Sequence, residues 1–286
     1  MTREGETASS SREWIEEGSR ILADAGIDTT RLDAEVLLAH ACSSSRVSMV
    51  TRTAQLSSDA VEAFRGMIKR RASREPIAYI VGRKEFFSLD FEVNGGVLIP
   101  RPETETLVES ALRFIATHPR ARVLDIGTGS GAIAIAIAVN APSAQIVATD
   151  ISKAALKVAH RNAVRNRCED RIEFIEADVF PDGESRFPLI LSNPPYVANG
   201  DLQNLEPEIR QYEPRVALTD NADGLAFYRR ISTESPKRLK SHGAVMVEIG
   251  AGQRPEVEAL FRRAGFSNID AVADLAGIDR VVIAKI

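Results

Sequence analysis

Strand-like and helix-like segments alternate from Arg101 to the end of the chain, and this alternation limits the fold more than any other feature. Short apolar runs predict strands at residues 123–126, 145–149, 172–175, 189–192, 244–249, 269–272 and 280–284. Helical spacing of apolar residues predicts helices between them at 130–139, 153–166, 222–239 and 255–264. Such alternation is typical of a parallel sheet covered by helices on both faces. We therefore predict a doubly wound α/β domain over residues 101–286.

The part of the chain before this domain has a helical pattern. Ser10 and Glu13 have the spacing of a capping box at the start of a first helix, which Gly26 ends. Apolar residues at helical spacing predict a second helix over 32–41 and a third after Ser57 and Ser58. We predict a small helical substrate-recognition domain over residues 11–75, preceded by a disordered polar tail, residues 1–10.

Residues 76–100 join the two predicted domains. They are rich in Ile, Val, Phe and Tyr, and Asn94, Gly95 and Gly96 form a turn signal. Both features are typical of a β-hairpin, which we predict as the linker.

Several cations lie near the end of the third predicted helix, including Arg70, Arg71 and Arg74. Cations in a last turn suit the helix dipole, which favours a solvated face. The same cluster could contact a macromolecular partner. The sequence leaves both interpretations open.

Composition excludes some classes of function. The chain of 286 residues has 36 Lys plus Arg against 40 Asp plus Glu, a net charge of −4, whereas proteins that bind nucleic acid through phosphates usually have a basic excess. Its two cysteines are far apart, without zinc-ligand spacing. No signal-peptide core or run of about 20 apolar residues is visible. We predict a cytoplasmic protein with no metal, no membrane partner and no direct nucleic-acid substrate.

A glycine-rich turn follows the first strand of the α/β domain. The run VLDIGTGSG, residues 123–131, places Gly127, Thr128, Gly129, Ser130 and Gly131 between a strand and a helix. Glycine allows a tight turn and the close approach of a ligand to the backbone. We predict that these five residues bind a nucleoside cofactor.

Carboxylates at the ends of the next two strands support a nucleoside ligand. Asp150 ends the second strand, where it can accept hydrogen bonds from both ribose hydroxyls. Asp178 ends the third strand at the place of an adenine amino group. Asp125 either caps the helix after the turn or points to the amino-acid end of the ligand.

This pattern resembles that of class I S-adenosylmethionine (AdoMet)-dependent methyltransferases. The resemblance implies a Rossmann-like sheet of seven strands with a reversed final strand, AdoMet as cofactor and S-adenosylhomocysteine as product. Members often have an aromatic residue where this chain has Val179, which the resemblance places over the adenine with less stacking area. We expect somewhat weaker cofactor binding from this difference, and the same chemistry.

The sequence NPPY, residues 193–196, ends the fourth predicted strand, where open α/β sheets bind ligands. The side-chain oxygen of Asn193 and the carbonyl of Pro194 can accept both hydrogens of an NH2 group, and Pro195 stiffens the turn. Two such acceptors orient the nitrogen and stabilise the positive charge that develops on it. Tyr196 can pack its ring against a planar substrate. We predict methylation at nitrogen, with Asn193, Pro194 and Tyr196 as catalytic residues and Asn193 to Tyr196 as the substrate site.

Segments around NPPY resemble the PrmC/HemK family of release factor glutamine methyltransferases. They are EPIAYIVG (75–82), EFF (85–87), VLIPRPETE (97–105), NLEPE (204–208), YEPRVAL (212–218) and DGLAFY (223–228). The resemblance implies that the chain methylates N5 of the glutamine in the Gly-Gly-Gln loop of bacterial release factors. It also implies that residues 127–131, Asp150 and Asn193 contact AdoMet, and that residues 193–196 hold the glutamine.

Other interpretations remain. NPPY is also found in enzymes that methylate an exocyclic amine of a DNA or RNA base, and a protein of this fold could bind ligands without catalysis. Arg101 and Glu103 either close over the cofactor or tie the hairpin to the sheet. We expect Glu206, Glu208 and Arg210 on a loop near the substrate mouth.

Overall fold

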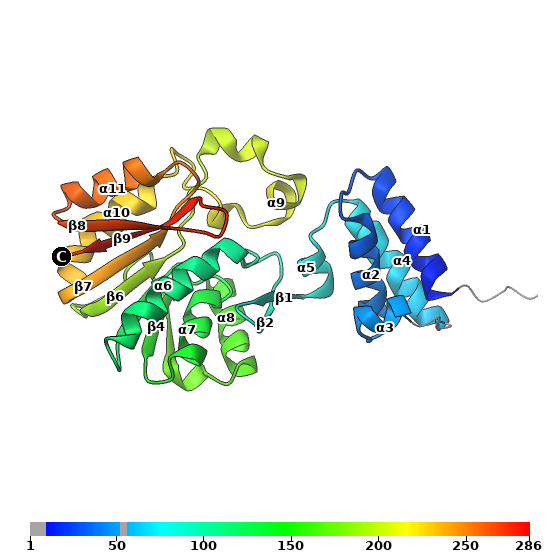
Figure 1. Cartoon of the computed structure of the whole chain (residues 1–286), viewed down its shortest axis with the longest axis horizontal. Helices are drawn as coiled ribbons and strands as arrows, with labels where there is room; N and C mark the ends of the chain where they lie inside the picture. The colour runs from blue at the N-terminus through cyan, green and yellow to red at the C-terminus, as the bar shows by residue number, and fades with distance from the viewer. Residues whose placement is uncertain (1–9, 52–55) are drawn as a thin grey trace, which may run out of the picture. The chain divides into compact units, whose positions relative to one another are not determined.

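The computed structural model describes residues 10–51 and 56–286, so nearly all of the predicted tail lies outside the described residues. The chain divides into two compact units (Figure 1). One unit contains the described residues up to Gly82 together with Glu206–Tyr212. The other contains Arg83–Leu205 and Glu213–Ile286.

The first unit is helical. Its helices are α1 (Ser11–Asp24), α2 (Thr30–Ala41), α3 (Arg46–Thr51), α4 (Ser58–Ala72), α5 (Ile77–Val81) and α9 (Pro207–Tyr212). The capping box before α1 is formed, because Ser10 Oγ accepts from the Glu13 amide and Glu13 Oε2 accepts from the Ser10 amide at 2.7 Å. The three predicted helices are confirmed as α1, α2 and α4. Apolar residues that they share, such as Leu22, Leu37 and Phe64, form the core of the unit.

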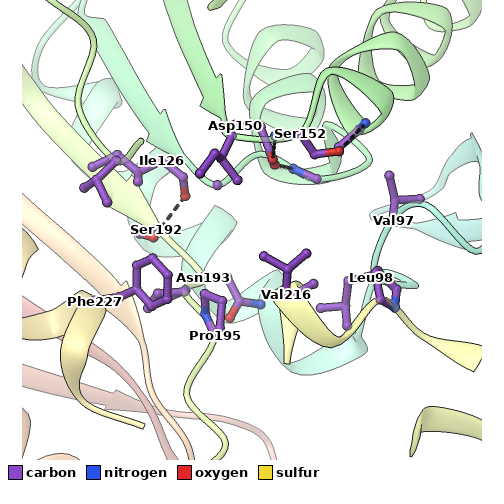
Figure 2. Close-up of a pocket in the computed structure, with 18 of the residues that line it drawn as sticks. Val97, Leu98, Ile126, Asp150, Ser152, Ser192, Asn193, Pro195, Val216 and Phe227 are labelled. Atoms are coloured by element: carbon purple, nitrogen blue, oxygen red, sulfur yellow. Dashed lines mark hydrogen bonds between the residues drawn. The ribbon is translucent and has the colours of Figure 1, made fainter. Parts of the chain in front are cut away.

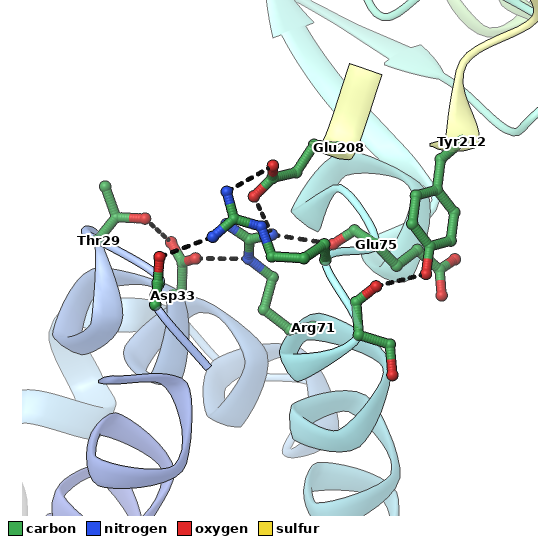
Figure 3. Close-up of polar contacts among 9 residues, drawn as sticks. Thr29, Asp33, Arg71, Glu75, Glu208 and Tyr212 are labelled. Atoms are coloured by element: carbon green, nitrogen blue, oxygen red, sulfur yellow. Dashed lines mark hydrogen bonds and ion pairs between the residues drawn. The ribbon is translucent and has the colours of Figure 1, made fainter. Parts of the chain in front are cut away.

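Arg71, in the last turn of α4, is buried, and its partners belong to the same unit (Figure 3). Arg71 Nε donates to Asp33 Oδ2 at 2.7 Å, and Arg71 Nη1 donates to Glu208 Oε1 at 2.9 Å. Arg74 Nη2 donates to Glu208 Oε2 at 2.8 Å. Both predictions for the cluster are therefore wrong for Arg71, whose side chain is only 8% exposed. The sequence could not show this, since Glu208 lies 137 residues after Arg71.

The position of Glu208 also corrects a prediction. Glu208 and Arg210 lie on the helix α9, and Glu206 directly precedes it, so the expected loop is wrong, while their place near the substrate mouth stays a prediction. Tyr212, the last residue of α9, donates its hydroxyl hydrogen to the Ser73 carbonyl at 2.6 Å. The short helix is thus attached to the end of α4 by two ion pairs and this hydrogen bond.

The predicted hairpin over 76–100 is shorter than expected. Residues 77–81 form α5, where Tyr79 and Ile80 are buried and Gly82 ends the helix in a left-handed conformation. The hairpin consists of β1 (Arg83–Phe86) and β2 (Leu89–Glu92), joined by Phe87 and Ser88 at φ 52° and 59°. Two left-handed residues match the twist of a two-residue hairpin turn. Asn94 instead accepts from the Gly96 amide and turns the chain away from β2.

The second unit contains the predicted Rossmann-like sheet (Figure 1). Its strands are β3 (Arg122–Ile126), β4 (Gln145–Asp150), β5 (Ile172–Glu176), β6 (Phe187–Ser192), β7 (Leu239–Glu248), β8 (Asn268–Ala273) and β9 (Asp279–Lys285). They lie in the order β5-β4-β3-β6-β7-β9-β8. The pairs from β5 to β7 are parallel, and β9 is antiparallel to both neighbours. The expected seven strands and reversed final strand are confirmed.

Helices cover both faces of this sheet (Figure 1). Val123 of β3 packs in one cluster with α6 (Glu105–Ala116), α7 (Ala132–Asn140) and α8 (Lys153–Arg165). Its neighbour Leu124 packs in the other cluster with α10 (Ala226–Arg238) and α11 (Arg254–Arg263). The period of two in a strand explains this division. Short 3₁₀ turns complete the unit: η1 (Pro102–Thr104), η2 (Glu169–Arg171), η3 (Asn199–Asn204) and η4 (Arg215–Ala217). In the described part of the chain, no helix is long and apolar enough to span a membrane.

Candidate active site

A cavity lies beyond the carboxyl ends of β3, β4 and β6 (Figure 2). It contains about 780 Å³ of empty space and is partly open to solvent. Eight predicted site residues line it: Gly127, Gly129, Asp150, Asp178, Val179, Asn193, Pro194 and Pro195. Four others, namely Thr128, Ser130, Gly131 and Tyr196, are not among its lining residues. The fold thus brings the cofactor and substrate candidates together at one edge of the sheet, where such sheets bind ligands.

The glycine turn combines lining and packing residues. Gly127 and Gly129 have φ of 71° and 56° and line the cavity. Gly131 has a packing role, because a Cβ at this position would lie 2.8 Å from Ile135 Cδ1 and 3.1 Å from Ala159 Cβ. This glycine therefore lets α7 and α8 approach each other. Contact between Gly131 and a cofactor stays a prediction.

Asp150 lies at the tip of β4 on the cavity wall (Figure 2). Its two oxygens accept from the amides of Gly129, at 2.9 Å, and Ser152, at 2.8 Å. Burial raises the pKa of Asp150, and these two hydrogen bonds oppose the rise. Because each carboxylate oxygen can accept a further hydrogen bond, Asp150 fits a ribose diol.

The residues after β5 form another part of the wall. The side chain of Asp178 accepts from Arg230 Nη1 at 2.8 Å. Val179 is buried at φ 74°, an unusual conformation for a β-branched residue, and its carbonyl accepts from Thr149 Oγ1 at 2.9 Å. That hydrogen bond stabilises the strained backbone, and the apolar side chain of Val179 lines the cavity.

Asp125 is completely buried and does not line the cavity. Thr128 Oγ1 donates to its Oδ2 at 2.7 Å, whereas Oδ1 has no hydrogen-bond partner among the described residues. Burial raises the pKa of Asp125 to about 7. Thr128 therefore supports this carboxyl, and the free Oδ1 is a buried acceptor under the glycine turn.

Asn193 follows β6 directly and presents its side chain to the cavity (Figure 2). Its Nδ2 donates to Thr104 Oγ1 at 3.1 Å. Because the side-chain nitrogen of Asn193 donates to Thr104, the side-chain oxygen Oδ1 is left to accept a hydrogen bond from a ligand. Pro194 and Pro195 also line the cavity and contribute no N–H donors to it.

Tyr196 does not line this cavity, and its side chain packs against the core cluster that contains α10 and α11. Burial raises the pKa of its phenol to about 12. Gln253 Nε2 donates to the Tyr196 carbonyl at 2.9 Å, and a Cβ on Gly224, at φ 77°, would lie 2.3 Å from the same oxygen. Contact between the Tyr196 ring and a substrate stays a prediction, while its backbone position is tightly determined.

Sequence reasoning missed several lining residues: Val97, Leu98, Val216, Ala217 and Phe227. They lie in VLIPRPETE, YEPRVAL and DGLAFY, the segments that carry the family resemblance. That resemblance was the signal that could have found them. Gln253 had no comparable local signal.

Arg101 has a structural partner. Its Nη2 donates to Glu213 Oε1 at 2.5 Å, and the Glu213 side chain is only 1% exposed. This ion pair fixes the position of Glu213, and the next residue in the chain, Pro214, lines the cavity. Arg101 thus stabilises a segment of the wall. Among the described residues, no group of three His, Cys, Asp or Glu side chains could hold a metal ion.

Comparison with known proteins agrees with this geometry. Two family models match, the PrmC N-terminal domain at residues 13–82 and the methyltransferase small domain at residues 104–209. A methyltransferase structure from Pyrococcus furiosus has a TM-score of 0.52 at 19% identity, covers 76% of this chain and 98% of that chain, and shows the shared fold.

Closer similarity is found among curated proteins. The release factor glutamine methyltransferase of Caulobacter vibrioides is 39% identical over 92% of this chain and 91% of its own length. That of Geobacter sulfurreducens is 46% identical over 93% of both chains. With this identity over nearly the whole length, and with the glycine turn, Asp150 and NPPY at one cavity, the chain belongs to the release factor glutamine methyltransferase family.

Proposed function

We propose that this protein transfers a methyl group from AdoMet to N5 of the glutamine in the Gly-Gly-Gln loop of bacterial release factors. The observation that carries the proposal is the position of Asn193 on the wall of the cavity that Asp150 also lines. Family membership identifies the reaction. Because Asp150 and Asn193 line the same cavity, the methyl donor and the methyl acceptor can meet there. Release factors act in translation, so the reaction belongs in the cytoplasm.

The chemistry of the wall fits AdoMet. Asp150 would accept from the ribose hydroxyls, and Val179 with Ile151 and Phe227 offers apolar surface to the adenine. Gly127 and Gly129 leave the backbone open to close approach. When bound, AdoMet supplies an electrophilic methyl group on a sulfonium.

The residues of NPPY would activate the amide. A planar amide nitrogen is a poor nucleophile because its lone pair is delocalised. Asn193 Oδ1 and the Pro194 carbonyl would accept its two hydrogens, which aims the nitrogen at the methyl group and stabilises the charge that develops on it. The methylated nitrogen is a strong acid, so water can take its proton and no side-chain base is needed. The two glycines before the glutamine have no side chains, which favours entry of the release factor loop into the cavity.

Mass spectrometry tests the proposal. The protein is incubated with AdoMet and a folded bacterial release factor, and with DNA and RNA in separate reactions. We expect a gain of one methyl group on the glutamine of the Gly-Gly-Gln loop and none on either nucleic acid. Methylation of a base, with an unmodified release factor, would overturn the proposal.

Asp150→Ala should weaken AdoMet binding by about 1.5–3 kcal/mol, the range for hydrogen bonds to a charged group. Titration calorimetry measures the change. Asp170→Ala, which removes an exposed carboxylate from η2, is the matched control and should bind AdoMet normally. Equal affinity of the Asp150 variant and wild type would show that the ribose is held elsewhere.

A further inference from the structure

Gln253 lies directly before α11, and its side chain joins two loops of the second unit. Its Nε2 donates to the Tyr196 carbonyl at 2.9 Å, and its Oε1 accepts from the Gly250 amide at 2.9 Å. A carbonyl can only accept and a backbone amide can only donate, so these two partners permit one orientation of the glutamine amide. The side chain thus connects the turn after β7 to the last residue of NPPY.

The backbone of Gln253 is fixed as well. The Gln253 amide donates to the Gly250 carbonyl at 3.1 Å, and its carbonyl accepts from the Val257 amide at 3.1 Å as the first bond of α11. Gly250 leaves space for the glutamine side chain, because a Cβ there would lie 2.9 Å from Gln253 Oε1 and 3.1 Å from Tyr196 Cδ2. The donor that Gln253 presents to NPPY is therefore held in place before any substrate binds.

The peptide unit between Tyr196 and Val197 is bonded at both of its polar groups. Gln253 donates to its carbonyl, and its amide, that of Val197, donates to the Leu218 carbonyl at 2.9 Å. Leu218 directly follows Ala217, which lines the cavity. The end of NPPY is thus fixed between the start of α11 and a segment of the cavity wall.

The NPPY turn is stiff between its two ends. The proline rings fix φ at Pro194 and Pro195, and each proline also confines the residue before it to extended conformations. At the first end, Ser192 belongs to β6 and donates its hydroxyl hydrogen to the Ile126 carbonyl at 2.9 Å (Figure 2). A stiff segment that is held at one end only can pivot as a whole. The bond from Gln253 at the other end removes this freedom.

We propose that Gln253 is a positioning residue that fixes the NPPY turn, so that Asn193 Oδ1 and the Pro194 carbonyl meet the substrate nitrogen together. Both acceptors lie on the stiff segment that Gln253 anchors at Tyr196. A displacement of reacting groups by about 1 Å can lower a rate on the order of 10²-fold. The inference deepens the proposed function and rests on it.

Two substitutions of Gln253 test this role. Gln253→Glu keeps the shape of the side chain and an acceptor for the Gly250 amide, but it places a carboxylate oxygen against the Tyr196 carbonyl. The repulsion should displace the turn and lower kcat by about 10–100-fold. Gln253→Met has neither the donor nor a repelling oxygen, so its kcat should fall below that of wild type but less than that of Gln253→Glu.

The separation of kcat from binding distinguishes positioning from a general structural role. AdoMet affinity, measured by calorimetry, and KM for the release factor should stay within about twofold of wild type in both variants, because remote contacts supply most of the binding energy. In NMR of Gln253→Glu, the Val197 amide signal should shift, because this amide belongs to the displaced peptide unit. The signal of Ile190, in the middle of β6, should not move.

Gln145→Glu is the matched control. It makes the same change at an exposed glutamine that begins β4, whereas the cavity lies beyond the carboxyl end of that strand. Its kcat, KM and melting curve should match those of wild type.

Gly250 supplies a second arm of the test. Gly250→Ala should also lower kcat, because the new Cβ would lie 2.9 Å from Gln253 Oε1 and must displace the amide that donates to Tyr196. The double variant Gly250→Ala with Gln253→Glu should be no slower than Gln253→Glu alone, since both changes remove the same hydrogen bond.

The outcomes separate two kinds of failure. A wild type that leaves the release factor unmethylated overturns the proposed function, and this inference with it. A wild type that methylates the release factor while Gln253→Glu and Gln253→Met retain its kcat overturns the inference alone. A loss of AdoMet affinity as large as the loss of kcat would also overturn it, because Gln253 would then support the cavity wall rather than the turn. If Gln253→Glu does not fold, unchanged kcat in Gln253→Met and Gly250→Ala overturns the inference.

Discussion

Asn193→Ala should lower kcat for release factor methylation on the order of 10²–10³-fold, the usual effect of removing one preorganised polar group that stabilises developing charge. The variant removes the Oδ1 acceptor from the cavity wall and leaves the Pro194 carbonyl as the remaining acceptor of the pair. One acceptor cannot fix the amide plane, so the loss should appear mainly in kcat. Steady-state kinetics with a folded release factor measures it.

The control for this prediction is Asn268→Ala, which removes an exposed asparagine side chain from β8. It should leave kcat and KM unchanged. Melting curves of both variants should match wild type, which excludes loss of the fold as the cause. A fall of less than fivefold for Asn193→Ala would contradict the assignment of this residue to catalysis.

Arg71→Met should destabilise the helical unit by about 3–5 kcal/mol, the cost of breaking a buried ion pair by removing one partner. Methionine keeps the apolar stem of the side chain and removes the guanidinium that Asp33 and Glu208 share. The side chains of Asp33 and Glu208 are only 8% and 13% exposed, so water cannot readily replace the lost guanidinium as their hydrogen-bond donor. Urea unfolding followed by the fluorescence of Trp14, the one tryptophan of the chain, measures this unit.

The adjacent arginine supplies a matched control. Arg70 pairs with Glu75 while its side chain is 48% exposed, so Arg70→Met should cost at most about 1 kcal/mol. Equal effects of the two substitutions would contradict the structural role of Arg71. Burial alone would raise the pKa of Glu208, but the bonds from Arg71 and Arg74 lower it. The stability that this carboxylate contributes is therefore present above about pH 4.5 and lost as the pH falls below it.

The sequence alone determined the order of the strands in the α/β domain and the chemistry of the cavity. The short apolar runs predicted all seven strands of the sheet, since each run has the length and composition of a buried strand. Glycines after β3, the acid that ends β4 and NPPY after β6 were recognisable because each depends on residues that are neighbours in the chain. The carboxyl ends of parallel strands meet at one edge, so these local patterns sufficed to place the site.

Only the tertiary structure decided which long-range partners these residues have. Residues 77–81 look strand-like in sequence but form α5, because packing of Tyr79 and Ile80 in the helical unit outweighs a weak β preference. Arg71 looks like a surface cation until the fold brings Glu208 to it, and Thr104 has no visible relation to Asn193 until the fold brings their side chains together. Local patterns report backbone preference and periodicity. Burial, ion pairing and the direction of an amide depend on contacts between residues far apart in the chain, which a local pattern does not encode.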